Sequence, residues 1–189
     1  MKILDVGCGV NKTEGAIGLD SNPRTGADVV HDLGNIPYPF EDNEFDSIVA
    51  NHVVEHVHDV MAFIGELHRV TRNGGRIKLI TPHYTNPDWP NDPTHRNHIN
   101  SYTFNTFMSG RQVFDFYTDI ELKPVYTYVS LLSLWKYLGI EFLVNLDQKA
   151  YGLRFLRKFW EQYLSMIVRG KELQFEFEVV KPVGSGSRQ

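Results

Sequence analysis

The first eighty residues alternate between short apolar runs and polar turns. Five apolar runs occur, at Lys2–Val6, Ala16–Asp20, Ala27–Leu33, Phe45–Asn51 and Arg76–Thr81. Each is about one strand long, and none keeps a strict two-residue alternation of apolar and polar side chains. Such runs are typical of strands that are covered on both faces of a parallel sheet. The pattern therefore predicts five parallel strands.

Helical spacing occurs between the last two runs and is missing between the first two. In "HDVMAFIGELHRVTRNGG" the apolar positions recur every three or four residues, and Asn73-Gly74-Gly75 is expected to end the helix. Only nine residues, Gly7 to Gly15, follow the first run, too few for a helix with its turns. We predict an α/β, Rossmann-like, doubly wound and mostly parallel sheet that lacks the helices before strand 1 and between strands 1 and 2.

The second half of the chain predicts a loop, a helical cap and a final strand. Residues 83–100 are polar, contain prolines and are too long for a passive connection. We expect a helix over Phe104–Phe116, a strand over Ile120–Val129 and two aromatic-rich helices over Leu131–Arg169. The alternating "LQFEFEVV" at 173–180 indicates an antiparallel strand at or near an edge. Residues 1–183 should form a single domain, with loop and cap over about 83–170 and a disordered tail at 184–189.

Composition and charge exclude some classes of partner. The net charge of −4 gives no indication of nucleic-acid binding, and no apolar run approaches the roughly 20 residues that span a bilayer. The single cysteine, Cys8, fits a reducing compartment, so we expect a cytoplasmic protein without stable membrane insertion. Six basic residues within 149–171 accompany only one acid, Glu161, and they interleave with aromatic residues. This interleaving leaves a role at a membrane surface open.

Acidic residues stand at the ends of the first three predicted strands. Asp5 precedes the glycine loop of Gly7 and Gly9, and Asp20 and Asp32 end the next two strands. Ligands of open α/β sheets bind beyond the carboxyl ends of the strands. Asp20 is placed to accept hydrogen bonds from a ribose diol, and Asp32 from the amine of an adenine. A single acidic residue at a strand end commonly only caps that end of the strand. Acidic residues at the ends of three successive strands favour a nucleoside ligand.

The segments "LDVGCG", "IGLDSNP", "VVHDL", "YPFEDNEFDSIVANHVVEH" and "LHRVTRNGGRIKLITP" follow one another within residues 2–82. In this order they resemble the class I S-adenosylmethionine-dependent methyltransferases, in particular the small-molecule, methyltransferase type 11-like branch. The resemblance implies S-adenosylmethionine as the cofactor. It also implies the cofactor-binding residues: Asp5, Gly7 and Gly9 around the methionine part, Asp20 at the ribose, Asp32 and Leu33 at the adenine, and Asn51 and His52 beneath the reactive methyl group.

Two other functions compete with this hypothesis. A nicotinamide-dependent oxidoreductase would also use a glycine loop, but the pyrophosphate of its cofactor gains much from a helix N-terminus. In this sequence Asn11 stands where a third glycine is frequent. The segment between strands 1 and 2 is also too short for the helix that would bind the pyrophosphate. S-adenosylmethionine has no phosphate, so the truncated loop favours the methyl donor. The remaining alternative is a cofactor-binding but inactive partner subunit.

Histidines supply the candidate acceptor chemistry. "HVVEH" at 52–56 matches a zinc-peptidase pattern, but it lies directly after the fourth strand of a methyltransferase-like order, so we expect no metal there. "DPTHRNHINSYTF" resembles acceptor-side segments of small methyltransferases from glycan and secondary-metabolite pathways. We therefore expect a small-molecule or glycan acceptor methylated at oxygen. The candidate catalytic residues are His56, His95 and His98, and the acceptor-binding ones are His83 and Tyr102. For the loop histidines, structural roles and a divalent metal stay open.

The missing helices also bear on assembly. A parallel sheet normally has both faces covered, and here two of the covering helices have no room. The cover should come from the aromatic helices of 131–169 or from a second subunit. We expect a homodimer that buries apolar surface of this region.

Overall fold

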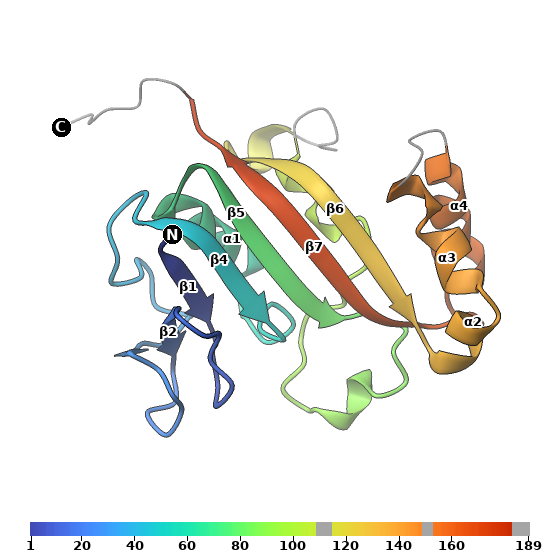
Figure 1. Ribbon diagram of the computed structural model, residues 1–189, viewed down its shortest axis with the longest axis horizontal. Helices are drawn as coiled ribbons and strands as arrows, with labels where there is room; N and C mark the ends of the chain where they lie inside the picture. The colour runs from blue at the N-terminus through green and yellow to red at the C-terminus, as the bar shows by residue number, and fades with distance from the viewer. Residues whose placement is uncertain (109–114, 149–152, 183–189) are drawn as a thin grey trace.

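The computed structural model describes residues 1–108, 115–148 and 153–182, and a single seven-stranded sheet organises them (Figure 1). The order across the sheet is β3-β2-β1-β4-β5-β7-β6. The strands are β1 Ile3–Val6, β2 Ile17–Asp20, β3 Val29–Val30, β4 Phe45–Asn51, β5 Thr71–Pro82, β6 Glu121–Leu131 and β7 Gly170–Val180. The predicted tail, residues 184–189, lies outside the described residues.

Strand directions confirm the predicted α/β class. The first five strands are parallel, whereas β7 lies between β5 and β6 and runs antiparallel to both. The predicted antiparallel strand is therefore next to the edge, and β6 is the edge strand. The third strand is shorter than predicted, since only Val29 and Val30 pair with β2.

The helix α1 (Val60–Val70) connects β4 to β5 as predicted, but it ends earlier. The Asp59 side chain caps its start by accepting a hydrogen bond from the Ala62 N–H, at 3.0 Å. At its end, the Thr71 hydroxyl donates to the Leu67 carbonyl, and the backbone turns extended at Thr71. The expected stop signal, Asn73-Gly74-Gly75, lies instead in the irregular beginning of β5.

The remaining helical segments are shorter than the sequence predicts. Instead of a helix over 104–116, the structure has the 3-10 turns η2 (Thr103–Phe107) and η3 (Asp115–Tyr117), and residues 109–114 lie outside the described residues. A further 3-10 turn, η1 (Trp89–Asn91), lies in the loop 83–100. The two predicted cap helices are broken into α2 (Ser133–Tyr137), α3 (Ile140–Val144), η4 (Leu146–Gln148), α4 (Arg154–Phe159) and the π-helical η6 (Trp160–Leu164).

The core lies on one face of the sheet. Figure 1 shows α1 behind the strands, where Phe63, Ile64 and Leu67 are buried. The sheet contributes alternate residues of each strand to this layer, and the Phe104 ring of η2 packs edge-on against Phe175 of β7, with 4.9 Å between ring centroids. One face of the sheet therefore holds the apolar contacts.

The opposite face of the sheet carries charged side chains. No described helix covers this face in Figure 1, and its side chains form cross-strand ion pairs. Arg76 lies 3.1 Å from Glu178, Lys78 lies 3.9 Å from Glu176, and Lys123 lies 3.7 Å from Glu178. Charged side chains therefore solvate this face where β5, β7 and β6 lie. The homodimer is not tested by this finding and stays a prediction.

Candidate functional site

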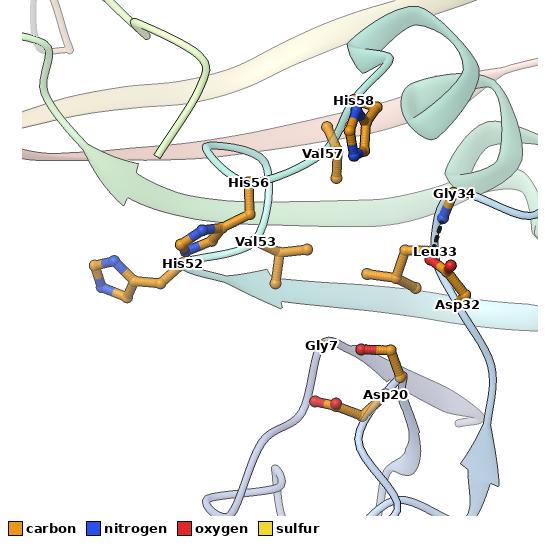
Figure 2. Close-up of a pocket in the computed structure, with 11 residues that line it drawn as sticks. Gly7, Asp20, Asp32, Leu33, Gly34, His52, Val53, His56, Val57 and His58 are labelled. Carbon is orange, nitrogen blue, oxygen red and sulfur yellow. Dashed lines mark hydrogen bonds between the residues drawn. The ribbon is translucent and has the colours of Figure 1, made fainter. Parts of the chain in front are cut away.

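A pocket lies at the carboxyl ends of β1 to β4, where the strand order reverses between β1 and β4. Its volume is about 290 Å³. This is the position at which open α/β sheets bind ligands. The lining residues come from the ends of four strands: Gly7, Asp20, Ser21, Asp32, Leu33, Gly34, His52, Val53, His56, Val57 and His58 (Figure 2).

The glycine loop after β1 approaches the segment after β4 closely. Gly7 has a φ of +66°, and a Cβ atom there would lie 2.4 Å from a methyl group of Val53. No other residue type fits this position without displacing Val53. Gly9 also has a positive φ, of +54°, but the space around it is open. Its N–H donates to the Asp20 carboxylate at 2.8 Å, which ties the loop to the end of β2.

Carboxylates hold the short loop in place of the missing helix. Asp5 accepts a hydrogen bond from the Thr13 N–H at 2.6 Å, and Asp28 accepts one from the Gly18 N–H at 2.7 Å. Asp5 is only 3% exposed and does not line the pocket. The structure gives Asp5 this anchoring role, and the contact with the cofactor that the resemblance implied stays a prediction.

Asp20 and Asp32 bring carboxylates to the pocket from neighbouring strand ends. Asp20 accepts from Gly9 and from the Asn22 N–H, one bond per oxygen, and each oxygen has two lone pairs. Asp32 accepts from the Gly34 N–H at 2.9 Å (Figure 2). In the same view the Leu33 side chain points toward Val53. Acceptors beside an apolar wall fit a ribose diol and an adenine ring, so these residues suit the expected cofactor.

His52 adds a positive charge to the pocket. It directly follows β4 in a left-handed conformation, with a φ of +55°. Its ring nitrogens lie 3.5 Å from a Glu172 oxygen and 3.3 Å from a Glu55 oxygen. Hydrogen bonds to Glu172, and then to Glu55, raise the pKa of His52 to about 9, so the ring is an imidazolium at neutral pH. Asn51 is exposed and does not line the pocket.

Comparison with known proteins finds one matching family model. The family model described as "Methyltransferase domain" matches residues 4–79, the segment that contains the glycine loop, both pocket carboxylates and His52. Residues 4–79 are therefore similar to the methyltransferase domain family. The comparison with curated proteins gives no match.

Solved structures similar to this chain have the same fold. A putative methyltransferase from Bacillus halodurans is 14% identical with a TM-score of 0.58, covering 95% of this chain and 93% of its own. An S-adenosylmethionine-dependent methyltransferase from Mesorhizobium loti is 14% identical with a TM-score of 0.54, covering 94% and 90%. The geranyl diphosphate C-methyltransferase from Streptomyces coelicolor is 15% identical with a TM-score of 0.59, covering 95% and 72%. Family and fold support S-adenosylmethionine as the cofactor of the methyltransferase domain.

Beyond the cofactor pocket, the methyltransferase domain brings two of the candidate catalytic histidines together. The rings of His56 and His95 have centroids 4.8 Å apart. His56 lines the pocket, and its Nδ1 lies 2.9 Å from the Thr94 hydroxyl. The His95 Nδ1 donates to the Trp89 carbonyl at 2.8 Å, which leaves the other ring nitrogen of a neutral imidazole as an acceptor. Ligand atoms of Glu55, His56 and His95 lie within 4.8 Å of one another, close enough to hold a metal ion.

The other acceptor-side candidates lie elsewhere. His98 stacks on Trp89, with 4.2 Å between ring centroids. Tyr102 lines a second pocket, beside β6 and α4. His83 is fully buried, and its ring nitrogens bond the Thr85 hydroxyl at 2.7 Å and the Glu161 carboxylate at 2.9 Å. These bonds give His83 a structural role, and its predicted contact with an acceptor stays a prediction.

Sequence reasoning missed Glu172 as a neighbour of His52. Glu172 belongs to β7, which comes 120 residues later in the chain and pairs with β5 so that Glu172 lies opposite Pro82. The alternation of β7 predicts that Glu172 points away from the core, but it cannot give the strand order. Only the antiparallel placement of β7 beside β5 brings this carboxylate to the pocket.

Proposed function

We propose that the chain, as a single domain over residues 1–183, is an S-adenosylmethionine-dependent methyltransferase that acts on an oxygen of a small-molecule or glycan acceptor. The observation that carries the proposal is the pocket at the strand-order reversal. There Asp20 and Asp32 flank an apolar wall, and the paired histidines His56 and His95 adjoin it.

The cofactor side follows from the chemistry of the lining residues. Asp20 would accept hydrogen bonds from the ribose hydroxyls and Asp32 from the adenine amine, with Leu33 and Val53 against the ring. The His52 imidazolium would pair with the carboxylate of the methionine part. When bound, S-adenosylmethionine supplies an electrophilic methyl group on sulfur. The chain contributes orientation and exclusion of water, which account for most of the catalysis in a transfer of this kind.

The acceptor side follows from the histidine pair. With its Nδ1 proton donated to the Trp89 carbonyl, neutral His95 presents a basic nitrogen near His56. An acceptor hydroxyl placed against this pair would lose its proton to His95 as the oxygen attacks the methyl group. His98 would act as a positioning residue, because it stacks on the Trp89 that orients His95.

Incubation with S-adenosylmethionine labelled at the methyl group and extracts of small molecules and glycans tests this function. Label in a small molecule or glycan, bound through oxygen, is the expected result. Label on nitrogen or carbon would contradict the oxygen target. Cofactor binding without transfer to any fraction would favour the inactive partner subunit.

Substitution of His95 tests the base. His95→Ala should lower kcat roughly 100-fold or more, because a general base of this kind contributes about that factor. His98→Ala should lower kcat less, and both variants should bind S-adenosylhomocysteine like the wild type. Full activity of His95→Ala would show that the base is another group. Activity that requires a divalent ion and disappears with a chelator would assign Glu55, His56 and His95 to a metal instead.

A further inference from the structure

The short helices after β6 form a surface of unusual character, which we call the cap surface, on residues 133–148 and 153–168. Figure 1 shows α2, α3 and α4 together beyond the edge strand β6. The helix α3 contacts both α2 and α4, so the three helices form one layer. Among the described residues no helix is both long and apolar enough to cross a bilayer.

The helices α4 and η6 bury several polar side chains together with Trp160, while most of their other apolar side chains point outward. Arg157, Glu161 and Ser165 are buried. Phe159 and Tyr163 are 52% and 69% exposed, one helical turn apart, with 5.2 Å between their ring centroids. A surface helix of a water-soluble domain has the opposite arrangement. The side that faces solvent is therefore the side that an apolar environment would favour.

The helix α3 and its C-terminal residue Asn145 also bury polar side chains, beside the apolar Val144. Glu141 and Asn145 are buried, where Glu141 accepts from the Leu131 N–H and Asn145 pairs with the N–H and carbonyl of Val129. The outward apolar residues of the cap surface, all at least 50% exposed, are Leu134, Tyr137, Leu138, Phe142, Leu143, Phe155, Phe159, Tyr163, Met166 and Ile167. Exposed apolar residues gathered in this way on a folded domain mark an interaction site.

The charges around the cap surface have one sign. Glu141 and Glu161 are buried, and Asp147 pairs with Arg157 at 2.6 Å. The exposed charged residues described between 133 and 171 are all basic, namely Lys136, Lys158, Arg169 and Lys171. The whole chain carries −4, so positive charge is concentrated where the apolar side chains are exposed. The partner should therefore be apolar and anionic.

A second pocket at the border of the cap surface suits a phosphate group. Its volume is about 580 Å³, and its charged lining residues are Arg154, Arg157, Lys158 and one acid, Asp147, which pairs with Arg157. The aromatic ring of Phe155 also lines it. Arg157 is 3% exposed, and its Nε is buried without a hydrogen-bond partner. Guanidinium and ammonium groups beside an exposed aromatic ring are the side chains that would receive an anionic headgroup next to acyl chains.

We propose that the cap surface binds peripherally to a bilayer that contains anionic phospholipid. The outward aromatic and aliphatic side chains enter the interface, and the basic residues and second pocket meet the headgroup phosphates. A second copy of the chain is the less favoured occupant, because a two-fold contact would bring two positive surfaces together. The proposal goes beyond the proposed function and does not depend on it.

Flotation of the full chain with lipid vesicles tests the proposal. Vesicles of phosphatidylcholine alone are compared with vesicles that contain phosphatidylglycerol, at low and high salt. The chain should float with the anionic vesicles at low salt, and salt should weaken binding. Phe159→Ser/Tyr163→Ser should lower partitioning at least about tenfold, since two aromatic rings are lost from the interface. Lys136→Glu/Lys158→Glu should lower partitioning onto the anionic vesicles, by about fivefold or more for each lysine that is replaced.

A matched control separates this surface from exposed aromatic residues in general. Phe116 and Tyr117 are 75% and 58% exposed, with 4.8 Å between ring centroids, and lie outside the cap surface. Phe116→Ser/Tyr117→Ser should partition like the wild type. Equal loss in both aromatic variants, or no flotation with any vesicle, would overturn the proposal. So would a dimer, at twice 21.8 kDa in light scattering, that Phe159→Ser/Tyr163→Ser converts to monomer without any change in flotation.

Discussion

His52 shows how single residues of distant elements set the charge of the pocket. Its imidazole lies between Glu55, three residues later, and Glu172 of β7. The same contact that raises the pKa of His52 to about 9 lowers the pKa of Glu172. The pocket therefore combines the Asp20 and Asp32 carboxylates with one cation. A cofactor with both a carboxylate and polar hydroxyl groups fits this distribution.

The raised pKa of His52 predicts a pH dependence of stability. A group whose pKa is raised by folding contributes stability that is complete below its unfolded pKa, about 6.5. This contribution is lost as the pH rises through about 9. His52→Asn, which tolerates the positive φ, should therefore be destabilised relative to the wild type at pH 6 and much less at pH 9.5. Urea unfolding at both pH values measures this difference. If His52→Asn is destabilised by the same amount at both pH values, the assignment of His52 as an imidazolium is contradicted.

Two glycines of the loop differ in what surrounds them, and this gives a controlled comparison. Gly7→Ala should be destabilised by about 1–2 kcal/mol for the left-handed backbone and by a further 1–3 kcal/mol for the contact with Val53. Gly9→Ala has the same backbone strain but open space, so only the first cost applies. Thermal unfolding measures both. Equal destabilisation would contradict the close approach of the loop to Val53.

At the scale of elements, the loop between β1 and β2 and the cap show two ways of replacing a regular helix. In the loop, Asp5 and Asp20 accept hydrogen bonds from the backbone N–H groups of Thr13 and Gly9, which a helix would have satisfied internally. In the cap, Glu161 of η6 links three segments. It bonds His83 after β5 at 2.9 Å and the Ser101 hydroxyl at 2.6 Å. Carboxylates thus fix both irregular parts, and of these Asp5 and Glu161 are buried.

Glu161→Ala should destabilise the protein strongly. It removes the hydrogen-bond partner of the buried His83 Nε2 and of the buried Ser101 hydroxyl, at a cost of about 1–3 kcal/mol for each group. Glu178→Ala, which removes a carboxylate from the solvated ion pairs of the open sheet face, should cost less than about 1 kcal/mol. Urea unfolding compares the two. A similar small loss for both would mean that Glu161 does not anchor the cap.

The elements differ in how well the sequence predicts them, for physical reasons. Phe45–Asn51 and the helix around Phe63 and Leu67 are predicted closely, because their apolar periodicity reflects burial against the same core. The helices of the cap are not predicted closely. They bury polar residues and expose aromatic ones, so the apolar periodicity of the sequence does not give the residues at which they begin and end. Asp20 and Asp32 were found because strand ends carry ligands in this fold. Glu172 required the order of strands, which a single sequence does not contain.

For the molecule as a whole, the two faces of the sheet differ in polarity on the β5, β7 and β6 side. The charged residues Arg76, Lys78, Glu176 and Glu178 lie on the face that helices would otherwise cover. The single apolar core on the other side supports the strand ends that form the pocket. The exposed apolar residues are concentrated instead on the helices beyond β6. Cofactor pocket and cap surface therefore lie on different parts of one sheet.

The central claim is that the pocket at the ends of β1 to β4 holds the methyl donor, and isothermal titration tests it most directly. S-adenosylhomocysteine should bind one site per chain, and NAD should not bind. Asp20→Ala should weaken binding at least about tenfold, because it removes charge-assisted hydrogen bonds to the ribose. Asp46→Ala, which removes another carboxylate that accepts a backbone hydrogen bond but does not line the pocket, should bind like the wild type. Binding of NAD in place of S-adenosylhomocysteine, or equal affinity of Asp20→Ala and wild type, would contradict the account.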